Sequence, residues 1–294
     1  MEKVIISDSV KRIGSRAFFE CYALREVVMS KSIEHIGNYA FEDCRLLQHI
    51  VLPKTLKYLG EGTFECCESL ISVDIPDSIT SVEKKVFCGC HSLSQVKLPD
   101  TITLIDEYAF ETCDLSQIVI PQSLLEIKDY AFSGCPIKYI NIPESVSTIG
   151  NSVFSGCTEL SEVHFSSTPS SFGKEVFEFC TYMQKILIPL GTRDKFELLL
   201  PDYKDKILEH VKGWIVKEIR PFSSEEIAAV KRAEVVASKY GNSICFFMHA
   251  GGQTYIPLCE SSSLSVGDTF DLTTAKVITL CHEGKVDIYR VIEK

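Results

Sequence analysis

The sequence contains no long apolar run and no excess of positive charge. No stretch approaches the ~20 consecutive apolar residues that a membrane-spanning helix needs, and the longest are short segments such as 243–248. The 294 residues carry 30 basic and 40 acidic side chains, which gives a formal net charge of −10 at pH 7. Surfaces that coat nucleic acid or bind anionic membranes need a dense positive field. We therefore expect neither a membrane span nor a nucleic-acid partner.

The first residues also lack the features of a secretory leader. Residues 1–8 contain no charged, apolar and small-residue regions in succession, so we expect a cytoplasmic protein. The alternative is a cell-surface or secreted protein whose leader has been removed. With 45% apolar residues, the chain has the composition of a globular protein of one or two domains with a substantial core.

Motifs of known catalytic and metal sites are missing. The sequence has no H-E-x-x-H, P-loop, G-x-G-x-x-G, G-x-S-x-G or EF-hand pattern. Cys66–Cys67 and Cys88–Cys90 lack the C-x₂-C pairs of a zinc site. Cys281–His282, and Cys245 with His249, are candidate nucleophiles, but residues adjacent in sequence do not form a catalytic dyad. We predict no enzyme, no catalytic residue, no metal and no cofactor.

A repeat of 22 or 23 residues fills most of the chain. Each of eight units between Asp8 and Pro189 approximates V-x-x-I-G-x-x-A-F-x-x-C-x-x-L-x-x-I-x-I-P. Such a unit cannot bury its own apolar side, so it must stack on the next. At ~4.8 Å per strand, eight coils make a rod of about 40 Å in which like side chains form columns. The phenylalanines recur at Phe18, Phe41, Phe64, Phe87, Phe110, Phe132, Phe154 and Phe177.

Within a unit, the apolar pattern changes period. Val73 and Ile75 are predicted to point inward and Ser72 and Asp74 outward, which is the alternation of a half-buried strand. A proline closes most units, where a residue without a backbone donor suits a strand end. The Ala-Phe element, clearest at 37–44, is too short for a full helix and reads as one helical or 3₁₀ turn.

The place of the cysteines within the repeat explains why most of the 13 are present. Eight of them occupy one slot in the repeat, where a small and easily buried side chain is wanted. We therefore expect reduced, buried thiols, as in a reducing compartment. These cysteines are Cys21, Cys44, Cys67, Cys90, Cys113, Cys135, Cys157 and Cys180.

The phrases at 36–44 and 149–157, each followed by L-x-x-I/V, resemble the BspA-type leucine-rich repeat, a family frequent in gut and oral bacteria. The resemblance covers all eight units. Glu83, Asp106 and Lys128 depart from it by replacing the usual glycine, and unit eight opens irregularly. The resemblance implies a right-handed solenoid of short parallel strands and helical or 3₁₀ turns that binds other macromolecules, often at a cell surface. It implies no catalytic residue.

The alternation also predicts which side chains the strands present outward. The outward set mixes charges, amides and aliphatic side chains, which fits a protein partner. It contains one aromatic residue, whereas sugar recognition by stacking favours several, so carbohydrate has less support. The alternative is an ordinary solvated sheet face. The candidate partner-binding residues are Glu26, His49, Asp74, Lys97, Tyr139, Asn141, His164 and Lys185.

The repeat stops after Pro189. Residues 192–200 have helical periodicity and are expected to close the open end of the solenoid, followed by a connector at 201–205. Further on, the sequence predicts a helix at 223–232 and hairpins around 251–252 and 282–285. We predict a repeat domain over 1–204 and a small α+β, β-rich domain over 205–294.

These observations predict a non-enzymatic protein-protein interaction module that presents a rigid repeat surface. One alternative gives the activity to the C-terminal domain, as a ligand-binding, nucleic-acid-binding or hydrolytic unit with the solenoid as a targeting arm. Another is a purely structural surface protein. The sequence leaves the partner unknown.

Overall fold

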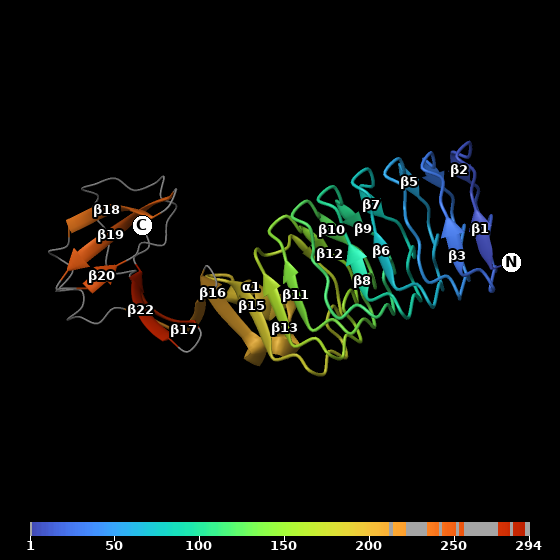
Figure 1. Ribbon diagram of the computed structural model, residues 1–294. Helices are drawn as coiled ribbons and strands as arrows, with labels where there is room; N and C mark the ends of the chain where they lie inside the picture. Colours follow the sequence, from blue (N-terminus) through green and yellow to red (C-terminus); the bar gives the residue numbers. More distant parts are fainter. Residues whose placement is uncertain are drawn as a thin grey trace. The chain divides into compact units, whose positions relative to one another are not determined.

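The chain forms two compact units, Met1–Ile207 and Leu208–Lys294. The computed structural model in Figure 1 describes residues 2–211, 214–221, 234–240, 243–250, 253–255, 276–282 and 285–291, with side chains for residues 2–210.

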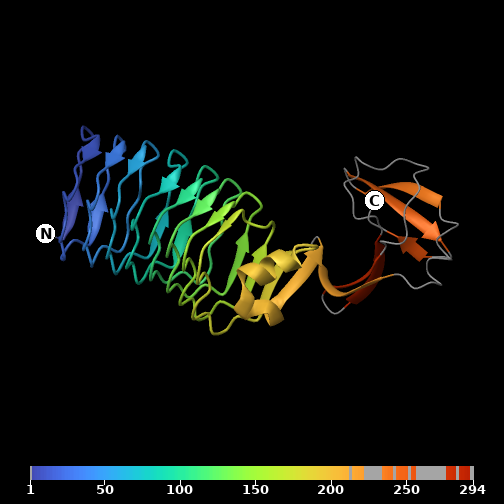
Figure 2. The same cartoon turned by 180° about the vertical axis from the view of Figure 1, so that it is seen from behind.

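The first unit is a stack of coils, one for each repeat, and each coil contributes short parallel strands (Figures 1 and 2). We call the strands that follow the cysteine slot the first ladder. They are β1 (Lys3–Ile5), β3 (Glu26–Val28), β6 (Ser72–Asp74), β8 (Gln95–Lys97), β11 (Tyr139–Ile142), β13 (Glu162–Phe165) and β15 (Lys185–Pro189). The second ladder contains β2 (Arg12–Ile13), β4 (His35–Ile36), β5 (Tyr58–Leu59), β7 (Ser81–Val82), β9 (Leu104–Ile105), β10 (Glu126–Ile127), β12 (Thr148–Ile149) and β14 (Ser171–Phe172).

A column of phenylalanines runs through the core of the stack. The ring centroids of successive coils lie 5.0 to 5.7 Å apart, and the rings are within 10° of parallel. Phe41 through Phe177 in this column are buried, while Phe18 in the first coil is half-buried. The stacked phenylalanine column predicted from the repeat is confirmed, because each coil supplies the apolar surface that covers the next.

A second column is made of cysteines. The thiols of Cys44, Cys67, Cys90, Cys113, Cys135, Cys157 and Cys180 are buried and reduced. Each donates to the carbonyl of the phenylalanine 25 or 26 residues earlier, at sulfur–oxygen distances of 3.0 to 3.2 Å. The cysteine therefore does more than fill space, since its thiol supplies a second hydrogen bond to a buried carbonyl that already accepts a backbone N–H within its own turn.

The Ala-Phe element is not the helical or 3₁₀ turn that the sequence predicts. In the coil at 37–44, Tyr39, Phe41 and Asp43 donate their backbone N–H groups to carbonyls of the next coil at 2.8 to 2.9 Å. Only the alternate residues Glu42 and Cys44 donate to carbonyls three residues back. Tyr39 and Asp43 adopt positive φ angles of 57° and 58°. Hydrogen bonding to the next coil replaces the hydrogen bonds along the chain that a helical turn would need.

Two short helices cover the last coil. Helix α1 (Arg193–Leu199) confirms the predicted terminal helix and buries Phe196. The predicted connector after it is instead the 3₁₀ helix η1 (Pro201–Lys206). Its Tyr203 donates its hydroxyl to the Phe177 carbonyl at 2.6 Å. The residues after the repeat therefore protect the terminal ring of the phenylalanine column from water.

The second unit is described through its strands. They are β16 (Ile207–Val211), β17 (Trp214–Pro221), β18 (Glu234–Tyr240), β19 (Ser243–Ala250), β20 (Gln253–Tyr255), β21 (Lys276–His282) and β22 (Lys285–Val291). From β17 the strand order is β17-β21-β22-β20-β19-β18. The pairs β18–β19, β19–β20 and β21–β22 are antiparallel. The helix predicted at 223–232 lies outside the described residues.

Candidate functional site

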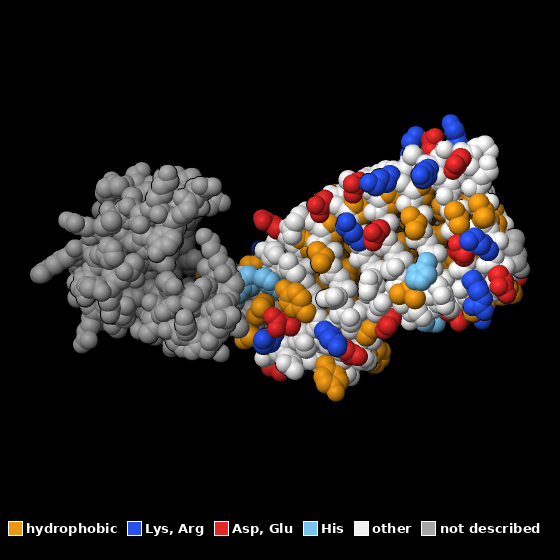
Figure 3. All heavy atoms as spheres, in the orientation of Figure 1, with side chains coloured by type: hydrophobic (Ala, Val, Ile, Leu, Met, Phe, Trp, Pro, Cys, Tyr) orange, Lys and Arg blue, Asp and Glu red, His pale blue; other side chains and the backbone are white. Residues whose placement is uncertain are grey.

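The outward face of the first ladder carries all eight predicted partner-binding residues. None of them is buried: each side chain is exposed or half-buried, as the alternation along the strands predicts. Figure 3 shows charged side chains of both signs interleaved with scattered apolar ones over the first unit. The face is therefore mixed in character, and its candidate residues differ in their surroundings.

At both ends of the ladder, the candidates pair with neighbouring coils. Glu26 accepts an ion pair from Lys3 at 2.7 Å, and Lys185 pairs with Glu162 at 3.0 Å. Isolated β-bridges join His49 to Glu26 in the preceding coil and to Ser72 in the following one. Ion pairs across exposed strands are worth little individually. These charges belong to the coil-to-coil contacts of the solenoid.

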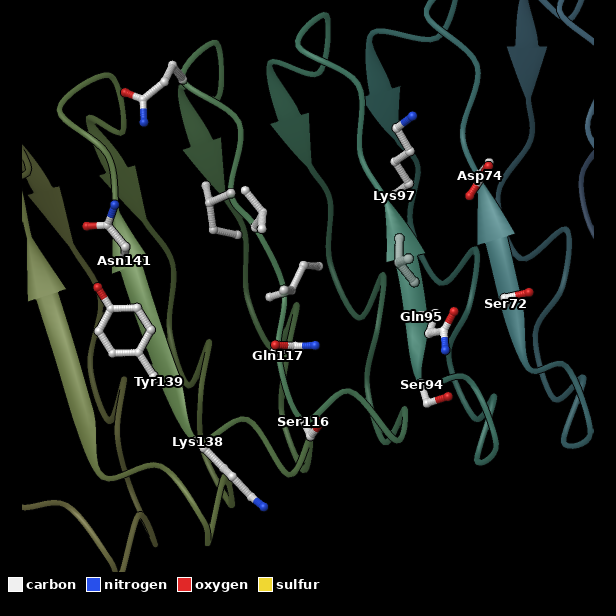
Figure 4. A pocket seen from close by; sticks show the side chains of 15 residues that line it. Ser72, Asp74, Ser94, Gln95, Lys97, Ser116, Gln117, Lys138, Tyr139 and Asn141 are labelled. Carbon is white, nitrogen blue, oxygen red and sulfur yellow. The ribbon is translucent and has the colours of Figure 1, made fainter.

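The other candidates gather near the middle of the ladder. Asp74, Lys97, Tyr139 and Asn141 line one groove with a volume of about 940 Å³ (Figure 4). His164 is the register partner of Asn141 on β13, one coil beyond the groove wall. The remaining lining residues are Ser72, Ser94, Gln95, Val96, Ser116, Gln117, Ile118, Val119, Ile120, Gln122 and Lys138.

The groove lies where the first ladder is interrupted. Strand β8 pairs with β6 on one edge, and β11 pairs with β13 on one edge. The coil between them, at 113–121, contains no strand. Among the described residues, the backbone of 117–120 makes no hydrogen bond to another backbone group. Two strand edges and one extended segment are therefore unpaired along the groove.

Two adjacent coils are one residue short, but only the first of them lacks a strand in the first ladder: one residue separates Cys135 from Ile137 in the coil of β11, just as one separates Cys113 from Leu115. In the coil of β8, two residues separate Cys90 from Leu93, whereas one residue separates Cys113 from Leu115 in the next coil. This coil is therefore one residue short in the turn that leads into the ladder. Phe110 nevertheless keeps its ring 5.4 Å from the rings on both sides. The core stays in register, and the length of the turn alone does not account for the missing strand.

The interruption exposes part of the apolar core. Val73 and Ile140, which point inward from neighbouring coils, are 2% and 0% exposed. The equivalent residues Val96 and Ile118 are only half-buried and line the groove. Val119 beside them is 84% exposed. The groove therefore has an apolar floor between polar walls.

The charged groups of the groove are two lysines and one aspartate. Asp74 and Lys97 are register partners on β6 and β8, and among the described residues neither has an ion-pair partner within 4.0 Å. Lys138 pairs with Glu159 at 3.4 Å. The Oδ1 atom of Asn141 is buried without a hydrogen-bond partner. The groove thus offers two charges without ion-pair partners, Asp74 and Lys97, and the unsatisfied acceptor of Asn141 lies buried in its wall.

The groove shows no arrangement for covalent or metal chemistry. Among the described residues that line it, no hydrogen bond joins a hydroxyl to a base, and catalysis by a nucleophile needs such a pair. Over the described part of the chain, no group of three or more His, Cys, Asp or Glu side chains could hold a metal ion. Burial raises the pKa of the Cys135 thiol to about 12, which suppresses the reactive thiolate.

Sequence reasoning missed several groove residues. Ser94, Ser116, Gln122 and Lys138 lie beside the strands and not on their outward positions. The nearest signal in the sequence is the 22-residue spacing after Phe110 and again after Phe132, which marks two short coils and does not single out the one without a strand. The candidate nucleophiles Cys245, His249 and Cys281–His282 have side chains outside the described set. Within the described residues, no helix is long and apolar enough to cross a membrane.

Comparison with known proteins agrees with the coil geometry. The family model described as "BspA type Leucine rich repeat region" matches residues 1–113 and 80–195, with six copies. No curated protein sequence matches the chain.

A solved structure shows the same fold. A leucine-rich repeat protein from Bacteroides ovatus ATCC 8483 is 28% identical with a TM-score of 0.54; the match covers 64% of this chain and 55% of that protein. This chain thus matches little more than half of that relative's length. The T. pallidum leucine-rich repeat protein is 25% identical with a TM-score of 0.46, and the match covers 67% of this chain and 82% of that protein.

Proposed function

This chain belongs to the BspA-type leucine-rich repeat family, and on that premise we propose that it is a non-enzymatic protein-interaction module. Leucine-rich repeat proteins are generally modules of this kind. The solenoid suits the role because every coil is held by its neighbours, so the outward face is organised before a partner arrives. A preorganised surface loses little conformational entropy on binding.

The observation that carries the proposal is the groove on the first ladder. Protein interfaces combine an apolar centre with a polar rim. Here Val96, Ile118 and Val119 provide the apolar centre, while Asp74 and Lys97 stand on the wall beside them. The proposal therefore places the contact surface at the coils from β6 to β11.

The chemistry of the groove supports binding over catalysis. Its polar side chains are mainly amides and hydroxyls, with one carboxylate and two lysines. General acid and base catalysis depends on a titratable group held against the reacting atom. Amides and hydroxyls instead provide hydrogen-bond donors and acceptors, which confer specificity on an interface.

A pair of exposed valines allows a direct test. Val119 in the groove is 84% exposed, and Val51 on the same ladder outside the groove is 78% exposed. A photoreactive amino acid at position 119 of the full chain is expected to cross-link a protein in native extract that the same group at position 51 does not. The proposal requires this partner, once purified, to bind Tyr139→Ala about 10-fold more weakly than the unmodified chain.

The variant Val51→Ala is the matched control and is expected to bind the partner normally. Tyr139 is 48% exposed, so its truncation should leave the melting temperature nearly unchanged. Equal cross-linking at both positions, or an unchanged affinity of Tyr139→Ala, would remove the groove from the contact surface.

A further inference from the structure

We propose that the groove binds an extended peptide segment of a partner protein. In this arrangement an apolar side chain of the peptide packs against Val96 and Ile118, and an acidic side chain at the adjacent position, on the outward face, pairs with Lys97. The inference rests on the proposed function and specifies the class of partner that the same groove takes.

The unpaired backbone is the first argument. The edge of β8 that faces away from β6 has no ladder partner, and neither has the edge of β11 that faces away from β13. The segment 117–120 between them makes no backbone hydrogen bond within the described residues. Exposed strand edges are templates for another extended chain, which satisfies their N–H and carbonyl groups by strand addition.

The apolar floor is the second argument. Along the first ladder, the inward column is buried at Val27, Ile50 and Val73 before the groove and at Ile140 after it. At the interruption, Val96 and Ile118 are half-buried and open to the groove. A single apolar side chain of a bound peptide would cover them and restore the burial found elsewhere in the column.

Charge complementarity selects the peptide's neighbouring residue. The whole chain carries a net charge of −10, yet Lys97 in the groove has no ion-pair partner within 4.0 Å among the described residues, whereas Lys138 is already paired with Glu159. In an extended peptide, adjacent side chains point to opposite sides. Val96 faces inward and Lys97 outward on β8, so the acidic residue that reaches Lys97 lies next to the apolar one.

A carbohydrate ligand fits these observations less well. Sugars are commonly held by stacking on aromatic rings, and Tyr139 is the single aromatic residue among those that line the groove. A sugar would also leave the strand edges unpaired. We therefore treat glycan binding as an outcome that contradicts the inference.

The test uses the full chain and a phage-displayed library of random twelve-residue peptides. Selection is expected to enrich peptides with an acidic residue next to an apolar one. The enriched peptide, made synthetically, is measured by fluorescence polarisation against the wild type, Val119→Arg and the matched control Val51→Arg. We expect Val119→Arg to bind at least 10-fold more weakly and Val51→Arg to bind within twofold of the wild type.

Two further measurements separate strand addition from contact through side chains alone. Methylating alternate backbone nitrogens of the peptide is expected to weaken binding at least 10-fold, because the methyl groups remove donors and block the strand edge. The exposed substitution Lys97→Glu is expected to weaken binding of the acidic peptide and to favour a version in which lysine replaces its acidic residue.

The results that overturn the inference are specific. Enriched peptides that bind Val119→Arg as well as the wild type, or that tolerate backbone methylation, contradict strand addition. Failure of the library to yield a peptide, or selective binding of a glycan array, also contradicts it. The proposed interaction function survives these results if the cross-linked partner still depends on Tyr139, and falls only if that dependence is lost too.

Discussion

The stacked phenylalanine column predicts how stability is distributed along the solenoid. Phe87 is fully buried, and its ring lies 5.7 Å from that of Phe64 and 5.4 Å from that of Phe110. Phe18 is half-buried and has one stacked neighbour in the column, at 5.0 Å. The same substitution at the two positions should therefore have different costs.

The magnitudes follow from burial and stacking. Truncating a buried phenylalanine to alanine costs about 3–5 kcal/mol, so we expect Phe87→Ala to lose about 4 kcal/mol. Phe87→Leu keeps most of the apolar volume but removes two ring pairs, each worth about 0.5–1.5 kcal/mol, and should lose roughly 1–3 kcal/mol. Phe18→Ala removes a partly exposed ring and should lose about 1–2 kcal/mol.

The assay is urea unfolding followed by far-ultraviolet circular dichroism, combined with amide hydrogen exchange. In a one-dimensional stack, Phe87→Ala should raise exchange in the coils on both sides of it, whereas Phe18→Ala should raise exchange in the first coils alone. Equal losses for the two alanine variants, or a loss below about 2 kcal/mol for Phe87→Ala, would refute the view that each coil is stabilised by its neighbours.

Two further outcomes follow from the cysteine column and the turns. Burial raises the pKa of Cys135 from its ordinary value of 9.0 to about 12, so the thiol stabilises the fold fully below pH 9 and that contribution is lost as the pH rises towards 12. Between pH 8 and 10 the free energy of unfolding of Cys135→Ala should fall less steeply than that of the wild type, by about 1.4 kcal/mol at pH 10; parallel curves would contradict this linkage. A Cβ atom on Gly173 would lie 2.3 Å from the Gly150 carbonyl carbon, whereas one on Gly14 would meet nothing within 4 Å. Thermal unfolding should therefore show a loss of about 1–3 kcal/mol for Gly173→Ala and almost none for Gly14→Ala, and similar melting temperatures for the two would contradict the close approach of the turns.

Periodicity in the sequence was sufficient to predict the solenoid, its phenylalanine column and its outward strand positions. These features repeat with the chain, so one unit determines the next. The turn at 37–44 was misread because the acceptors of Tyr39 and Phe41 are 22 residues further along the chain. No local pattern distinguishes a turn that satisfies its own N–H groups from one that depends on a neighbouring coil.

The groove could be predicted only in part. The short spacings after Phe110 and Phe132 are both visible in the sequence, but only the first of these coils lacks a strand in the first ladder. The stacked rings keep their 5.4 Å separations through that coil, while Val96 beside it is only half-buried. That outcome follows from a competition between core packing and strand pairing, which the linear sequence does not contain.

The coil at 113–121 is a local fault in an otherwise periodic stack. A periodic array offers the same surface at every step, so no position along it is chemically special. A fault confined to the outward side makes the surface different there, while the phenylalanine column in the core remains continuous. In this chain, the segment 117–120, which forms no strand between β8 and β11, makes the outward surface there different from that of the neighbouring coils.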